Sequence, residues 1–153
     1  MNLSEGQKNC LLNVINVLDH ISNEDYITKC WNKDMIILLS EGELSEDHVC
    51  NTIAFNCREA LNILEDNHFY ELVETEGGFG VWQELALLLN NRTMKSLVNV
   101  CKKIFLFLEN GDTDQSGEEL MKNLYWLNVV EYSKVALVDI LEDVNVNRSD
   151  YLL

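Results

Sequence analysis

The most unusual feature of this 153-residue chain is that it contains no proline. Proline makes up about 5% of an average sequence and interrupts helices, so its absence is typical of a chain that is helical almost throughout. Basic residues are also scarce, because 11 Lys and Arg stand against 26 Asp and Glu, for a formal net charge of −15. Non-specific nucleic-acid binding needs an excess of cations to neutralise phosphates, and the charge balance argues against that class of function.

Long apolar runs and paired cysteines are missing as well. No run approaches the roughly 18 apolar residues of a membrane span, and the N-terminus has neither the basic nor the apolar region of a signal peptide. The five cysteines are an odd number with no Cys-x-x-Cys pair, which favours neither a disulfide framework nor a zinc site. We therefore expect a cytoplasmic or nuclear protein with no metal and no cofactor.

The apolar residues that are present recur with the 3.6-residue period of an α-helix, and strands find little support. Ser4 and Gln7 have the spacing of a capping box, and Asn110-Gly111 is a good C-terminal stop. The sequence predicts an all-α fold. After a first helix that follows Ser4, helices are expected over 23–39, 45–64, 69–76, 79–89, 93–108 and 118–144, the last broken near Asn128.

Four of these helices end alike, with two apolar residues, a polar one, an apolar one, Leu and an acid, except that Leu106 takes the polar position in the third copy. The matching segments start 46, 44 and 33 residues apart, near the period of about 40–47 residues of armadillo and HEAT repeats. They are residues 14–19, 60–65, 104–109 and 137–142.

The segment Phe69–Leu89, with its break at Gly77-Gly78, resembles the first two helices of an armadillo repeat, and 93–108 looks like the third. Residues 24–66 resemble a less regular copy and 111–144 a shortened one. The resemblance implies a short right-handed α-solenoid of about three armadillo/HEAT-like repeats. It would form a single domain over 1–153, with approximate units 1–22 (partial), 23–66, 67–110 and 111–144.

In such a solenoid the third helices lie side by side and present one face to a partner protein. Armadillo proteins use a recurrent Asn on that helix to pair with the backbone of a bound peptide, and Asn16 and Asn62 are at or near that place. Acidic residues clustered at the turns would attract a basic partner. A peptide or helix of another protein is therefore the expected partner, and the expected contact residues are Asn51, Phe55, Arg58, Asn62, Lys95, Asn99, Lys102 and Leu106.

Other interpretations remain open. The chain could be an irregular helical bundle, a regulatory or decoy protein whose hydrophobic groove takes an amphipathic helix. It could also be a structural domain that associates with itself by end stacking. Residues 112–117 match the first half of a calcium loop, but Asn123 stands where a bidentate Glu is needed. No nucleophile or acid–base signature is present, so no enzymatic activity is expected.

Overall fold

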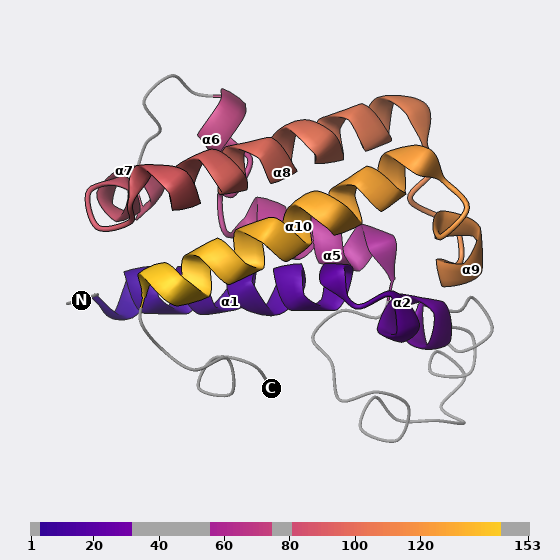
Figure 1. Ribbon diagram of the computed structural model, residues 1–153, viewed down its shortest axis with the longest axis horizontal. Helices are drawn as coiled ribbons and strands as arrows, with labels where there is room; N and C mark the ends of the chain where they lie inside the picture. Colours follow the sequence, from indigo (N-terminus) through magenta and orange to yellow (C-terminus); the bar gives the residue numbers. More distant parts are fainter. Residues whose placement is uncertain (1–3, 32–55, 75–80, 145–153) are drawn as a thin grey trace.

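The computed structural model describes residues 4–31, 56–74 and 81–144, which form eight helices and no strand (Figure 1). The predicted all-α fold is confirmed for this part of the chain. No helix in it is both long and apolar enough to cross a lipid bilayer. The helices are α1 (Glu5–Ser22), α2 (Glu24–Cys30), α5 (Cys57–Asp66), α6 (Glu71–Glu74), α7 (Val81–Ala86), α8 (Asn91–Asn110), α9 (Gly117–Leu120) and α10 (Leu124–Asp143).

The three long helices lie side by side, with α10 between α1 and α8 (Figure 1). Helices α8 and α10 are antiparallel. At one end the Asn90 N–H donates to the Asp143 carboxylate at 2.7 Å, and at the other the ring centroids of Phe107 and Trp126 are 5.1 Å apart. Helix α5 packs against α1 and runs opposite to it. The Cys10 thiol near the start of α1 donates to the Asn67 carbonyl just after the end of α5, so the start of one helix lies beside the end of the other.

The core that joins these helices is apolar and rich in aromatic rings. At one end Trp31 and Trp126 are both buried, with ring centroids 5.7 Å apart. At the other end Phe69 meets the edge of Trp82, whose indole N–H donates to the Asn67 carbonyl at 2.7 Å. Aromatic side chains bury large apolar areas, so these two clusters stabilise both ends of the bundle.

Several helix ends follow the capping chemistry of the sequence. Ser4 and Gln7 form the predicted capping box at the start of α1, and α8 ends at Asn110 with Gly111 as its C-cap. Ser116 and Glu119 form a second capping box that opens α9. Each box satisfies backbone N–H groups that the first turn of a helix leaves without partners.

Three predicted helices are wrong in their extent. The helix expected over 23–39 ends at Cys30 as α2, because Trp31 has a non-helical backbone and is its C-cap. The helix expected over 45–64 does not pass through residue 56, because Asn56 is extended and its side chain accepts from the Glu59 N–H at 2.7 Å to start α5. The last break lies at residues 121–123 rather than near Asn128, which is inside α10. Both starts use Asn as an N-cap, a role in which it satisfies the orphan N–H groups of the first turn. The predicted cap at Ser45 and the turn at Gly77-Gly78 lie outside the described residues.

A solenoid of three armadillo-like repeats is not confirmed. The four similar segments do end their helices, but α1 and α8 run in one direction while α5 and α10 run in the other (Figure 1). Two of the four ends therefore lie at each end of the bundle. Equivalent residues of all four segments do not form one row, which was the arrangement expected from the repeats.

A close backbone contact joins α2 to α9. The Gly117 N–H donates to the Trp31 carbonyl at 2.6 Å, and Gly117 is buried. A Cβ atom at this position would stand 2.0 Å from the Ile27 carbonyl oxygen. Glycine is required here because the two backbones approach closely, and this contact holds the short helices α2 and α9 together.

Candidate functional site

The contact residues predicted on α5 are only partly within the described structure. Asn51 and Phe55 lie outside it. Arg58 and Asn62 are exposed and line a hollow of about 290 Å³ with Tyr70 and Leu108. The Arg58 guanidinium already pairs with the Asp114 carboxylate at 2.6 Å, across two side chains that are 60% and 65% exposed.

The contact residues predicted on α8 form a separate surface. Lys95, Lys102 and Leu106 are exposed and Asn99 is half-buried. None of the four lines the hollow that holds Arg58 and Asn62, to which α8 contributes only Leu108 among described residues. Residues two positions apart on a helix are rotated by about 200° about its axis. Leu106 therefore points away from the hollow that Leu108 lines. The structure therefore brings the predicted residues together as two groups and not as one face.

Two other positions of the repeat pattern are structural. Asn16, expected near a peptide-binding position, is only 2% exposed within α1. Asp139, the equivalent position on α10, is 8% exposed and accepts from the Ser96 hydroxyl. Arg92 pairs with both Asp139 and Glu142, at 3.3 Å and 2.9 Å. These polar contacts join the start of α8 to the end of α10.

The segment 112–117, weighed above as half of a calcium loop, has a structural role for several of its polar residues. Asp112 accepts from the Asp114 N–H at 2.8 Å, Asp114 pairs with Arg58, and Ser116 caps α9. The residues that the structure describes contain no group of three acidic, His or Cys side chains able to hold a metal ion.

Burial shifts the pKa values of two cysteines and one histidine. Burial raises the pKa of the Cys10 thiol to about 11, and burial with the nearby carboxylates of Asp112 and Asp114 raises the pKa of Cys57 to about 12. Both thiols are protonated at neutral pH, which is the opposite of what a nucleophile needs. Burial also lowers the pKa of His20 to about 4, and its ring stacks on Tyr26 with centroids 4.7 Å apart.

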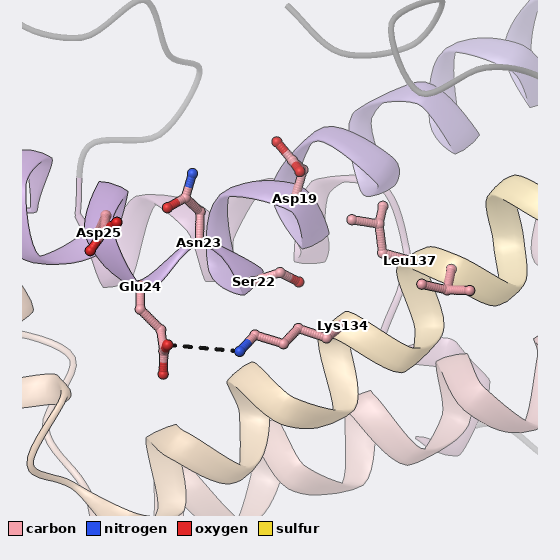
Figure 2. A pocket seen from close by; sticks show the side chains of 8 residues that line it. Asp19, Ser22, Asn23, Glu24, Asp25, Lys134 and Leu137 are labelled. Atoms are coloured by element: carbon pink, nitrogen blue, oxygen red, sulfur yellow. Dashed lines mark ion pairs between the residues drawn. The ribbon is translucent and has the colours of Figure 1, made fainter.

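A notch of about 410 Å³ separates the junction of α1 and α2 from α10, and carboxylates dominate its lining (Figure 2). Glu24 reaches towards Lys134 on the opposite wall, with 3.8 Å between the carboxylate oxygen and the ammonium nitrogen. Asp19 and Asp25 lie along α1 and α2 on either side of Asn23 (Figure 2). Lys134 also pairs with Glu131 at 3.2 Å, so the one cation among the described residues that line the notch is shared between two carboxylates.

Exposed apolar side chains concentrate on α10. Of the nine large hydrophobic residues that the described structure exposes, five belong to this helix. We call these five the α10 face. They are Leu124 (75% exposed), Tyr125 (41%), Tyr132 (38%), Val135 (56%) and Val138 (56%).

The α10 face borders the notch and has more exposed large apolar residues than the neighbouring helix. Val138 lines the notch together with Lys134. On α8 the exposed residues include Lys95 and Lys102 and two large apolar ones, Leu106 (41% exposed) and Leu108 (43%). Exposed apolar side chains gathered on one helix often mark a protein–protein contact.

The sequence contained a signal for this surface that the repeat interpretation did not use. Within 124–144 apolar residues occupy nearly every side of the helix, more than one buried face requires. Only the positions of α1 and α8 show which side of α10 is left uncovered.

Comparison of the chain with protein-family models, with curated proteins and with solved structures finds no match. The resemblance to armadillo repeats therefore stays a prediction, and the site must be interpreted from its own geometry.

Proposed function

We propose that this protein is a non-enzymatic interaction module that binds a segment of another protein through the α10 face and the adjoining notch. The observation that carries the proposal is the exposure of Leu124, Val135 and Val138 on the helix that lies between α1 and α8. Burying these side chains against a partner would remove their apolar area from water, which stabilises a complex by about 25 cal/mol per Å² before the costs of association.

The composition of the surface fits an interface with an apolar centre and a polar rim. Val135 and Val138 lie one turn apart, and Tyr132 stands beside them with the Lys103 ammonium 4.9 Å from its ring centroid. Glu131 and Lys134 form a polar edge through their ion pair. Tyrosine and apolar residues surrounded by charged ones are typical of protein-binding surfaces.

A groove formed by the third helices of an armadillo-like solenoid is the second candidate for the contact surface. Its support is the exposed position of Asn62 and of Lys95 and Lys102 on α8. In this form of the proposal, a double substitution Arg58→Glu and Lys102→Glu abolishes partner capture while the fold is kept.

Site-specific photo-crosslinking distinguishes the two surfaces. A photoreactive phenylalanine analogue replaces Val138 in one variant, Asn62 in a second and Lys95 in a third, all positions that are exposed. In extract of the cells that make the protein, we expect one partner to be captured from position 138 and none from 62 or 95. Unlabelled protein should compete, whereas a competitor with Val135→Ser and Val138→Ser should not.

The opposite pattern, with capture from positions 62 and 95 alone, would move the contact to the third-helix surface. Capture from none of the three positions would refute the interaction module. A self-associating domain predicts instead that position 138 crosslinks to a second copy of the chain and that sedimentation gives twice the monomer mass.

A further inference from the structure

The notch and the α10 face together specify the chemistry of the partner, an inference that rests on the proposed function. We propose that they bind a basic amphipathic helix, whose apolar side covers Val135 and Val138 and whose Lys or Arg side chain enters the notch beside Glu24 and Asp25.

Most neutral polar groups of the notch are already used by the chain itself. The Ser22 hydroxyl donates to the Leu18 carbonyl at 2.6 Å, and the Asn23 side chain accepts from the Tyr26 N–H at 3.0 Å as the N-cap of α2. The carboxylates of Asp19, Glu24 and Asp25 are therefore the groups that give the notch its character (Figure 2).

Glu24 and Asp25 exceed the positive charge that the described residues bring to them. Of the described residues that line the notch, Lys134 is the one cation. Lys134 lies 3.8 Å from Glu24 and closer, at 3.2 Å, to Glu131, and Asp25 has no ion pair with any residue that the structure describes. A guanidinium or ammonium from a partner would find an uncompensated negative field here, and an acidic partner would be repelled.

The apolar part of the surface is also bordered by acids. Glu131 and Glu142 are 65% and 63% exposed, and each lies four residues from Val135 or Val138 on the same side of α10. The chain as a whole carries a formal charge of −15. A basic segment therefore gains long-range attraction before it makes any contact.

A second copy of this chain fits the surface less well. In a two-fold dimer centred between Val135 and Val138, Glu131 of one copy would approach Glu142 of the other. A second copy also carries the same net charge of −15, and the apolar area of two valines is small beside the area that a stable dimer needs.

A helix is the form of partner that matches the length and spacing of the surface. The 20 residues of α10 span about 30 Å. On its exposed side Leu124, Val135 and Val138 follow helical spacing, with the polar residues Asn128 and Glu131 between Leu124 and Val135. A partner helix that lies along α10 can contact this side with residues at i, i+3, i+4 and i+7 while its flanks carry cations.

Three synthetic peptides test the proposal on the full chain. All are 18-residue helices with the same leucine stripe, and their flanking positions carry lysine, glutamate or glutamine. We expect the lysine peptide to bind at least about tenfold tighter than the glutamate peptide in fluorescence anisotropy at low salt, with the difference shrinking in 0.5 M salt. Amide shifts in the NMR spectrum of the labelled protein should lie on α10 and at the junction of α1 and α2.

Variants with opposite expected signs make the test specific. Asp25→Asn removes a notch carboxylate and should weaken the lysine peptide about threefold, whereas Lys134→Gln removes the competing cation and should strengthen it about twofold. Val138→Ser should weaken it about tenfold. The matched controls Glu109→Gln and Leu106→Ser change exposed residues of α8 and should leave the affinity unchanged.

The outcomes separate this inference from the proposed function. Equal binding of all three peptides on the α10 face would overturn the basic partner and keep the interaction module. Binding of the lysine peptide elsewhere, no binding at millimolar concentration, or dimers formed through α10 would also overturn the basic partner. The module itself fails only if the crosslinkers at positions 138, 62 and 95 all capture nothing.

Discussion

The contact between α2 and α9 predicts that adding a single methyl group to the chain removes a large fraction of its free energy of unfolding. The substitution is Gly117→Ala. The new Cβ would stand 2.0 Å from the oxygen and 2.7 Å from the carbon of the Ile27 carbonyl, and 3.1 Å from the Thr28 Cα. All three atoms belong to the backbone of α2, so no side chain can rotate away.

The size of the effect follows from these distances. Real Cβ atoms essentially never approach a heavy atom within 3.0 Å, so α2 and α9 must separate by about 1 Å at this point. The hydrogen bond from Gly117 to Trp31, now 2.6 Å long, would then exceed the normal range. Overpacking costs about 1–3 kcal/mol and a lost hydrogen bond about 1 kcal/mol, so we expect the free energy of unfolding to fall by about 3 kcal/mol.

Gly6 provides the matched control, because it is also a helical glycine. A Cβ atom there meets nothing within 4 Å in the first turn of α1. Gly6→Ala should raise the free energy of unfolding by about 0.5–1 kcal/mol, since alanine restricts the unfolded chain and favours helix.

Urea unfolding followed by circular dichroism at 222 nm measures both variants. The reasoning is refuted if Gly117→Ala has the same unfolding midpoint and slope as the wild type, or if the two glycine substitutions shift the midpoint in the same direction. A Gly117→Ser variant should resemble Gly117→Ala, because the clash involves the Cβ atom alone.

Three further predictions concern buried polar groups. Burial lowers the pKa of the His20 side chain from 6.5 to about 4, so the folded state resists its protonation. About 3 kcal/mol of the free energy of unfolding that is present above pH 6.5 should therefore be lost as the pH falls to 4. The urea midpoint of the His20→Gln variant should depend less on pH in that window than the midpoint of the wild type. The Trp126 indole N–H has no hydrogen-bond partner among described residues, whereas that of Trp82 donates to the Asn67 carbonyl. Trp82→Phe should therefore lower the free energy of unfolding by about 1 kcal/mol more than Trp126→Phe, as measured by thermal melts. Asp139→Ala removes the carboxylate of α10 that Ser96 and Arg92 of α8 contact, and the free energy of unfolding measured in urea should fall by about 2 kcal/mol. Asp143→Ala should lower it less, because the Asp143 side chain makes a single, exposed contact.

Local chemistry accounts for the parts of the fold that could be predicted from the sequence. The capping box of Ser4 and Gln7 and the stop at Gly111 depend on residues within a few positions of one another. The same chemistry explains the breaks that were misplaced, since Asn56 and Asn123 are N-caps that a purely apolar period does not reveal.

The arrangement of the surface could not be predicted in the same way. Whether Val135 is buried depends on which helices cover α10, and these are separated from it in sequence by whole helices. The similar helix ends indicated where helices stop but not their direction, which is set by packing such as that of Phe107 on Trp126. The position of Arg58 beside Asp114 is likewise a non-local contact.

The order of the helices along the chain has a consequence for how the protein is made. Leu11, Ile15 and Leu18 of α1 are fully buried, and α10, against which α1 packs, is synthesised about 110 residues later. At about 5–20 residues per second, a ribosome needs on the order of ten seconds to produce the last helix after the first has emerged. Helices α2, α5 and α7 also pack against α1 and are made earlier, so during that interval they can cover part of its apolar surface. The part that packs against α10 has no partner in the nascent chain until synthesis is nearly finished, which is the kind of exposed apolar surface that chaperones bind during translation.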